Sequence, residues 1–306
     1  MMGPVAAYFP YDVGPPPQTS DLVSDRIAGP LGAVHVLRPR SAAPTALFLH
    51  GVSLDSTCWT PLVRAAGRDP VSWLLVDLPG FGASDPLAGP VSLDEMAAAV
   101  LATLDALEVP ETHVVGHSMG GFLGLHLAAR HPDRVRSLAT LNGAYISVLD
   151  LVNDPFRAAL RHPRTWATYR AVRIVAGGGR LVQAAVGATA RAGVLRWGTS
   201  GLAARPRALP ESLLRALAAG ARPRSFRYAE ATGRGYDWRA IWSTISVPVL
   251  AGYGVRDRLV TAHDARCLRE VLPDLDELVL DDASHLSPME QPDRYFTELD
   301  RFWHQR

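Results

Sequence analysis

Short continuous apolar runs that alternate with helical patterns constrain the fold of this 306-residue chain more than any other feature. Such runs are typical of strands buried on both faces of a parallel sheet. They lie at Thr45–Leu49, Val71–Val76, His113–Val115, Val135–Leu141, Val247–Ala251 and Glu277–Leu280. Helical periodicity follows at Leu93–Leu107, Met119–Arg130, His263–Val271 and Pro292–Trp303. The alternation predicts a doubly wound α/β sheet, preceded by a hairpin whose strands, residues 22–28 and 33–37, flank a Gly-Pro-Leu-Gly turn.

The alternation stops between about residues 145 and 240, where the sequence favours helices and is rich in Ala, Leu and Arg. We therefore expect an inserted helical cap over residues 145–240 and an α/β core formed by residues 22–144 and 241–306. Residues 1–21 are interpreted as a flexible, Pro-rich leader. The expected cap carries 16 arginines and only five acidic residues. Cap and core could therefore attract one another across a cleft, although solvated helix faces would explain much of the excess.

The segment Gly116-His117-Ser118-Met119-Gly120 joins an apolar run to a helical pattern. A serine at such a sharp turn is the sequence of a nucleophile elbow, in which the hydroxyl oxygen is pushed out of the backbone. The two glycines permit the turn because side chains there would collide with the neighbouring strand and helix. Ser118 is the candidate nucleophile, provided that a base lies beside it.

An acid and a histidine follow late strands in the order that this hypothesis requires. Asp257 comes after the run that ends at Ala251, and His285 comes after the run that ends at Leu280. We expect His285 to accept the Ser118 proton and Asp257 to orient the imidazole. Asp282 is a second candidate for the acid. The alternatives are a helix cap at Asp257 and a packed loop histidine at His285.

Acyl transfer also needs donors for the oxygen that becomes negative. The Met119 N–H, directly after the nucleophile, is one candidate, and the Val52 N–H in the loop after residues 45–49 is the other. Ser53 is an alternative to Val52. His50 is expected to support this loop rather than to transfer a proton.

Composition excludes several other chemistries. All 31 Lys+Arg residues are arginine, which removes a lysine-containing phosphate loop and a lysine Schiff base. The net charge of +1 predicts no attraction to nucleic acid. No apolar run approaches the roughly 20 residues of a membrane span, and the start of the chain does not resemble a secretion signal. We expect a cytoplasmic protein, monomeric or dimeric, without membrane association, cofactor or metal.

Together these motifs resemble those of the α/β-hydrolase superfamily, in its cap-bearing branch of serine hydrolases. The resemblance extends from Leu22 to Trp303 and includes His50-Gly51, the Asp77–Ser84 loop, the elbow, Asp257 and His285 in order. It implies an eight-stranded, mostly parallel sheet with the cap above the active site. Epoxide hydrolases and haloalkane dehalogenases of this superfamily have aspartate at the elbow, so the serine argues against those activities.

The leading hypothesis is a serine hydrolase of the carboxylic ester class that cleaves an ester or lactone through an acyl-enzyme on Ser118. A thioesterase or C–C bond hydrolase would use the same triad. A small-molecule binding or signalling module built on the same fold is the alternative from another class. The expected partner is a small molecule with an apolar acyl or alcohol part. Its candidate contacts are His50, Ser53, Tyr145, Trp166 and Trp197, and further aromatic candidates are Tyr169, Phe226, Tyr228 and Trp238.

Overall fold

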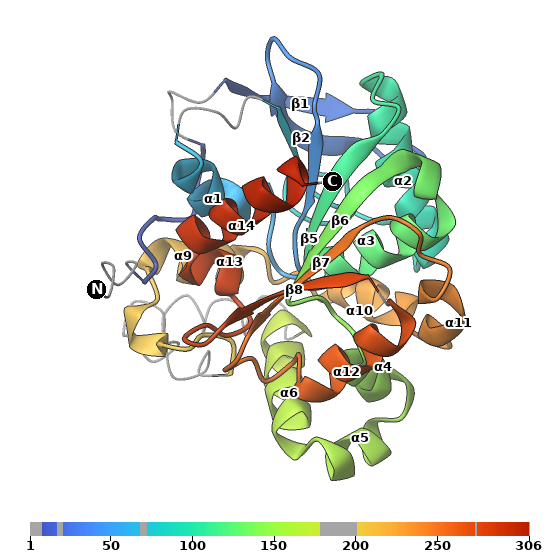
Figure 1. Cartoon of the computed structure of the whole chain (residues 1–306), viewed down its shortest axis with the longest axis vertical. Helices are drawn as coiled ribbons and strands as arrows, with labels where there is room; N and C mark the ends of the chain where they lie inside the picture. The colour runs from blue at the N-terminus through green and yellow to red at the C-terminus, as the bar shows by residue number, and fades with distance from the viewer. Residues whose placement is uncertain (1–7, 17–20, 68–71, 178–200, 273, 306) are drawn as a thin grey trace.

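A computed structural model of the chain describes residues 8–16, 21–67, 72–177, 201–272 and 274–305. Its centre is an eight-stranded sheet with the order β1-β2-β4-β3-β5-β6-β7-β8 (Figure 1). β2 pairs antiparallel with β1 and β4, whereas all the other pairs are parallel. The strands are β1 (Leu22–Ile27), β2 (Val34–Pro39), β3 (Ala46–Leu49), β4 (Trp73–Val76), β5 (Thr112–His117), β6 (Val135–Leu141), β7 (Val249–Gly254) and β8 (Leu275–Leu280). The predicted mostly parallel α/β sheet is confirmed.

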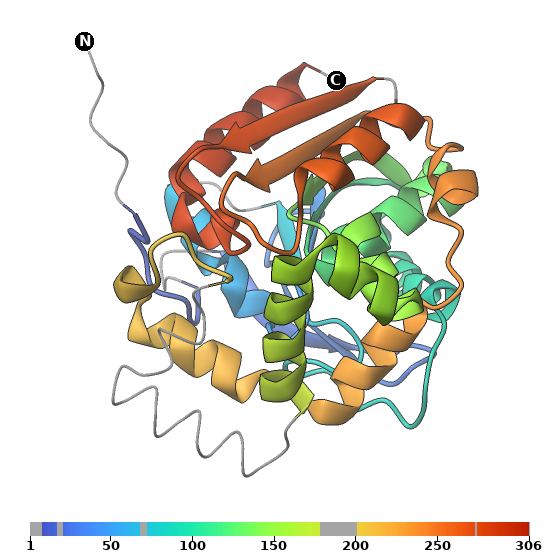
Figure 2. The same cartoon turned by 90° about the horizontal axis from the view of Figure 1, so that it is seen from below.

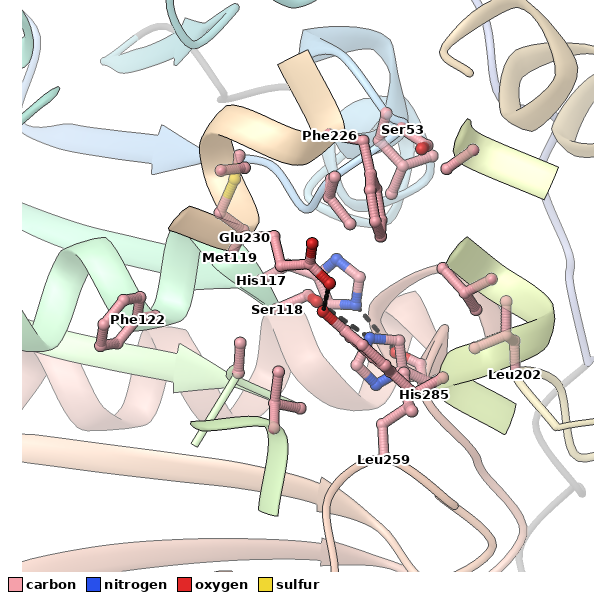
Figure 3. Close-up of a pocket in the computed structure, with 18 of the residues that line it drawn as sticks. Ser53, His117, Ser118, Met119, Phe122, Leu202, Phe226, Glu230, Leu259 and His285 are labelled. Atoms are coloured by element: carbon pink, nitrogen blue, oxygen red, sulfur yellow. Dashed lines mark hydrogen bonds between the residues drawn. The ribbon is translucent and has the colours of Figure 1, made fainter. Parts of the chain in front are cut away.

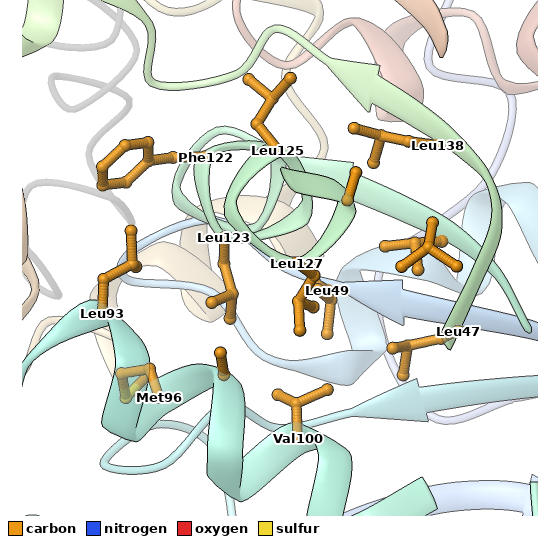
Figure 4. Packing of buried hydrophobic residues seen from close by; sticks show 14 of the residues in the cluster. Leu47, Leu49, Leu93, Met96, Val100, Phe122, Leu123, Leu125, Leu127 and Leu138 are labelled. Atoms are coloured by element: carbon orange, nitrogen blue, oxygen red, sulfur yellow. The ribbon is translucent and has the colours of Figure 1, made fainter. Parts of the chain in front are cut away.

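Helices cover both faces of the sheet. Because successive side chains of a buried strand point to opposite sides, each strand contributes to a core on either face. Leu47 and Leu49 of β3 lie in one core with α2 and α3, as Figure 4 shows. Phe48, between them, lies in the second core, to which α1 and α14 contribute. The helices outside the β6–β7 connection are α1 (Thr60–Ala65), α2 (Leu93–Ala106), α3 (Met119–Arg130), α12 (Ala262–Val271), α13 (Ser287–Glu290) and α14 (Pro292–His304).

In the part that the structure describes, the long connection between β6 and β7 contains helices joined by short irregular segments. We call its helices the inter-strand helices: α4 (Ile146–Asn153), α5 (Pro155–Arg161), α6 (Pro163–Gly177), α9 (Glu211–Ala219), α10 (Pro223–Thr232) and α11 (Trp238–Trp242). Most of them gather on one side of the molecule, beyond the ends of the parallel strands (Figure 2). Among the described residues, no helix combines the length and apolar character that a membrane span requires.

Polar contacts anchor these helices to the core. Ser225 Oγ of α10 donates to the Gly80 carbonyl at 2.7 Å, and Arg222, directly before α10, donates to the same carbonyl at 3.2 Å. Toward the β8 edge of the sheet, the buried carboxylate of Asp264 in α12 accepts hydrogen bonds from the Ser147 N–H at 2.7 Å and from the Ser147 hydroxyl at 2.6 Å. The inter-strand helices are therefore fixed to the loop after β4 and to α12, which follows β7.

Residues 8–16 differ from the flexible leader that we expected over residues 1–21. Tyr8 donates from its hydroxyl to Glu290 at 2.6 Å, and the Val13 N–H donates to Ser212 Oγ at 3.3 Å. The Val13 side chain is buried against the second core. This segment packs because its aromatic and apolar residues find partners on α9 and α13, which its proline content did not indicate.

Two glycines allow α3 to approach the sheet closely. A Cβ atom on Gly116 would lie 2.2 Å from the Gly120 carbonyl oxygen, and one on Gly120 would lie 2.0 Å from the Leu49 carbonyl oxygen. Backbone atoms cannot rotate away from such contacts, so α3 would have to move off β3.

We predict that Gly120→Ala lowers the free energy of unfolding by about 3 kcal/mol or more, since overpacking against backbone cannot be relieved by a rotamer change. Gly89→Ala is the matched control, because a Cβ atom there meets nothing within 4 Å. Urea denaturation of both variants measures the difference. Equal stability of the two variants would contradict this account of the helix–sheet contact.

Candidate active site

Ser118 lies between β5 and α3 in a backbone conformation that is rare for a residue with a side chain, with φ of 52° and ψ of −114°. The end of the adjacent strand β6 holds it there. The Ser118 N–H donates to the Leu141 carbonyl at 3.1 Å, and the Ser118 carbonyl accepts from the Ala144 N–H at 2.8 Å. Strained positive-φ conformations of this kind persist only where the surroundings fix them, and they concentrate at functional sites.

His285 and Asp257 extend from Ser118 in one line of hydrogen bonds. His285 Nε2 lies 3.0 Å from Ser118 Oγ, and His285 Nδ1 lies 2.9 Å from Asp257 Oδ2. All three side chains are buried. With the carboxylate on Nδ1, the neutral imidazole carries its proton there and leaves Nε2 free to accept the serine proton.

The Asp257 carboxylate is itself fixed by three donors. Oδ1 accepts from the N–H groups of Leu259 at 2.7 Å and Val260 at 3.1 Å, and Oδ2 accepts from the Asn142 side-chain amide at 2.8 Å. Asp282, the second candidate for the acid, instead pairs with Arg205 and with Arg256. The structure thus brings Asp257, not Asp282, to His285.

The two expected oxyanion donors flank Ser118. Val52 and Met119 both line the cavity above it, and Met119 is the first residue of α3, where the helix dipole favours negative charge. In the part of the chain that the structure describes, neither N–H donates to a backbone carbonyl. Ser53 also lines the cavity, at φ of 61°, and its buried hydroxyl has no protein partner among the described residues.

His50 holds the loop that carries Val52 through two contacts of its ring with backbone atoms. Its Nδ1 lies 2.7 Å from the Gly51 carbonyl, and its Nε2 accepts from the Leu78 N–H at 3.0 Å. Burial lowers the pKa of His50, so the imidazole is neutral and both ring nitrogens are occupied by backbone. His50 does not line the cavity, which departs from its expected role as a substrate contact and agrees with its expected role in the loop.

The cavity above Ser118 has a volume of about 170 Å³ and a largely apolar wall. The core contributes Ser118, His285, the Val52–Leu54 segment and the start of α3, and the connection between β6 and β7 contributes most of the other lining residues (Figure 3). Its apolar wall includes Val148, Leu149 and Val152 of α4, Val172 and Val175 of α6, Leu217 of α9, Phe226 and Ala229 of α10, and Leu202, Leu259 and Leu286.

The aromatic candidates are divided between the cavity and the core. Tyr169 and Phe226 line the cavity. Tyr145 does not: it is fully buried, its hydroxyl lies 2.8 Å from Thr140 Oγ1, and it packs against Trp242. Trp166 belongs to a side cluster with Leu151 and does not reach the cavity wall. Trp197 lies outside the described residues.

Three polar residues at the site were missed by the sequence analysis. Asn142 positions Asp257, and the Asn-Gly pair directly after the apolar run 135–141 could have marked a turn there. Glu230 lines the cavity from α10, and nothing in its sequence context distinguishes it from an exposed helical glutamate. Glu290 accepts a hydrogen bond at 2.5 Å from the N–H of Ser284, the residue before His285. The sequence around Glu290 contains no recognisable motif.

His117, the elbow residue before the serine, is also buried and lines the cavity. Its Nε2 lies 2.8 Å from the His285 carbonyl, so it braces the histidine loop against the elbow. Burial and the neighbouring His285 lower the pKa of His117 to about 3. Within the ranges that the structure describes, no group of three or more His, Cys, Asp or Glu side chains is arranged to hold a metal ion.

A family model for the alpha/beta hydrolase fold matches residues 44–292, which include every residue of this site. The chain belongs to the alpha/beta hydrolase family. It is 28% identical to 3-oxoadipate enol-lactonase 2 of Acinetobacter baylyi over 82% of this chain and 85% of that protein. It is also 28% identical to a pimeloyl-[acyl-carrier protein] methyl ester esterase of Vibrio atlanticus, over 85% of this chain and 94% of that protein.

Solved structures of the family share the fold. Naproxen esterase of Bacillus subtilis superposes with a TM-score of 0.70 at 22% identity, over 92% of this chain and 91% of that one. The family match and these relatives identify the chain as an α/β-family hydrolase.

The buried His117 predicts an acid-sensitive stability for this hydrolase. Because its pKa is lowered to about 3 in the folded protein, the unfolded chain binds a proton first as the pH falls below about 6.5. The contribution of the neutral His117 to the free energy of unfolding is therefore present above about pH 6.5 and is lost progressively toward pH 3. Between pH 6.5 and 4.5 the loss amounts to about 2 kcal/mol relative to His117→Gln, which cannot be protonated.

Chemical denaturation across this pH range, on the wild type, His117→Gln and His304→Gln, measures the effect. The exposed His304 is the control, and its variant should follow the wild-type curve. Parallel curves for the wild type and His117→Gln would contradict the assignment of a neutral buried imidazole.

Proposed function

We propose that this protein is a serine hydrolase that cleaves a carboxylic ester or lactone through an acyl-enzyme on Ser118. The observation that carries the proposal is the hydrogen-bonded series Ser118–His285–Asp257 at the floor of an apolar cavity. The enol-lactonase and methyl ester esterase among its relatives support the same reaction class.

In the first half of the reaction, Ser118 Oγ attacks the substrate carbonyl carbon while His285 Nε2 takes the hydroxyl proton. The Val52 and Met119 N–H groups stabilise the resulting oxyanion, and Asp257 stabilises the imidazolium. The tetrahedral intermediate then expels the alcohol, which receives the proton from His285. The product at this stage is an ester of the acyl group with Ser118.

In the second half, His285 removes a proton from a water molecule as the water attacks the acyl carbon. Collapse of this second intermediate breaks the bond to Ser118 Oγ, which takes the proton back. A lactone follows the same steps, except that its alcohol stays attached to the acyl chain. The net reaction consumes one water and releases the acid and the alcohol.

The inter-strand helices act in this proposal as a cap over the catalytic residues, with residues 145–240 as the inserted unit. Their apolar side chains form most of the cavity wall, so they decide which acyl and alcohol groups fit. A cavity with so little polar surface favours a substrate with an apolar body, bound by the burial of its hydrocarbon.

Other readings of the same site are less well supported. A thioesterase or C–C hydrolase would use identical catalytic groups, and the 16 arginines of residues 145–240 would favour an anionic substrate for such an enzyme. Among the residues that the structure describes no arginine lines the cavity, so their side chains do not support this suggestion. A binding module without turnover does not require the alignment of Ser118, His285 and Asp257.

Ser118→Ala is predicted to lower kcat/KM for p-nitrophenyl butyrate by about four orders of magnitude or more, because the nucleophile is lost. Ser41→Ala, on the exposed surface, is the control. A fluorophosphonate probe should add its mass to the wild type at Ser118 and leave Ser118→Ala unlabelled. Retained esterase activity in Ser118→Ala would refute the acyl-enzyme mechanism.

Asp257→Asn is predicted to lower kcat by about 10⁴-fold, because an amide at this position no longer selects the productive imidazole tautomer. Asp282→Asn, which removes the nearby carboxylate that pairs with Arg205, should change kcat by no more than about threefold. Steady-state kinetics on the same ester compares the two variants. The reverse ranking would assign the acid to Asp282.

A further inference from the structure

One charged side chain stands in the otherwise apolar wall that the inter-strand helices contribute to the cavity. Glu230 of α10 lines it, and only 6% of its side chain is exposed. Ser118 and His285 line the same cavity, and Figure 3 labels all three residues. A carboxylate in such surroundings is costly unless its oxygens accept hydrogen bonds.

Within the part of the chain that the structure describes, donors reach one of the two oxygens. Tyr169 donates from its hydroxyl to Glu230 Oε1 at 2.7 Å, and Arg173 Nε lies 3.5 Å from the same atom. Burial and the negative charge of Glu230 raise the pKa of Tyr169, so the tyrosine keeps its proton and remains a donor. Among the described residues, no side chain or N–H donates to Oε2.

Because none of the described residues donates to Oε2, this oxygen sets a requirement on what enters the cavity. A ligand group with a polar hydrogen would satisfy Oε2, an apolar group would leave it unsatisfied, and a second carboxylate would repel it. The charge-bearing side chains that touch the cavity in the described part of the chain are Glu230 and two histidines, His117 and His285. The pKa of His117 is lowered, which keeps it neutral and leaves it unable to offset a second negative charge.

We propose that Glu230 is a specificity-determining residue that binds a hydrogen-bond donor on the substrate. The preferred substrate is then an ester or lactone whose apolar chain ends in a donor such as a hydroxyl, and an ester with a terminal carboxylate is discriminated against. This inference rests on the proposed ester hydrolysis at Ser118 and names the substrate class for that site.

A purely structural role for Glu230 makes a different prediction. If its function were only to join α10 to α6 through Tyr169, its removal would weaken the fold and lower activity toward all esters equally. A specificity role changes the ratio between substrates of different charge instead.

The kinetic test uses p-nitrophenyl esters of two chain lengths, six and eight carbons, each with a methyl, hydroxyl or carboxylate end. They are compared in the wild type, Glu230→Gln and Glu211→Gln. Gln keeps the shape of the side chain but has no negative charge. Glu211, on the exposed surface of α9, is the matched control.

In the wild type we expect kcat/KM for the carboxylate ester to fall about tenfold or more below that of the hydroxyl ester at one or both lengths. Glu230→Gln should bring the two within about threefold, chiefly through KM, and Glu211→Gln should keep the wild-type ratio. Equal ratios in the wild type and Glu230→Gln would overturn the inference.

Tyr169→Phe keeps the inference testable if Glu230→Gln does not fold. This variant removes the donor to Oε1 but leaves the negative charge in place, so discrimination against the carboxylate ester should persist. Loss of the discrimination in Tyr169→Phe, with a folded protein by circular dichroism, would overturn the inference in favour of the structural role.

A binding experiment separates this inference from the proposed function. Calorimetry with Ser118→Ala measures the affinity of hexanamide, 6-hydroxyhexanamide and the monoamide of adipic acid, none of which needs to be hydrolysed. Preference for the hydroxyamide, without ester turnover by the wild type, would support the inference and reject the reaction. Ester turnover together with equal affinity for the hydroxyamide and the adipic monoamide would reject the inference alone.

Discussion

The left-handed backbone of Ser118 is the constraint on which the rest of the site depends. β5 and α3 meet there at an angle that is possible only because Gly116 and Gly120 have no side chains to collide with the backbone. The end of β6 then fixes the turn through the N–H and carbonyl of Ser118. One strained residue thus sets the position of the hydroxyl and, in the next peptide unit, of the Met119 N–H.

Buried carboxylates organise the loops around this turn. Asp77 accepts from the N–H groups of Ser56 at 2.6 Å and Ala83 at 2.7 Å, and so ties the loop after β3 to the loop after β4. Although burial alone would raise the pKa of Asp77, the hydrogen bond from His35 and the surrounding donors outweigh it and hold this pKa well below the usual range.

Glu290 has the corresponding position on the other side of the site. It accepts from the N–H groups of Ser284 at 2.5 Å and Ala204 at 2.7 Å, and joins the His285 loop to the inter-strand connection. In this case burial dominates and raises the pKa of the carboxyl. Neither residue touches the cavity, yet each fixes a loop that does, because a buried carboxylate leaves its donors little freedom to move.

The sequence predicts the sheet and the order of the catalytic candidates, because both depend on local patterns. Strand β7 shows where such prediction ends. The apolar run stops at Ala251, but the strand continues to Gly254. Gly252 and Gly254 fit there because a side chain would collide with Tyr295 or Ala283. Tyr145 and Tyr169 show a second limit. Both are aromatic residues in the same helical region, and only tertiary packing assigns one to the core and the other to the cavity.

The charge of the inter-strand region illustrates why composition does not give the field inside a cavity. Its arginines suggest a site for anions, but several of them are engaged elsewhere. Arg222 binds the carbonyls of Gly80 and Gly82, and Arg205 pairs with Asp282 on the core. Coulomb interactions fall with distance and are screened at the surface, so a ligand above Ser118 is influenced most by the nearest wall. In the described residues the acidic side chain of that wall is Glu230 and no arginine touches the cavity, so Arg222 and Arg205 attach the region to the core rather than line the site.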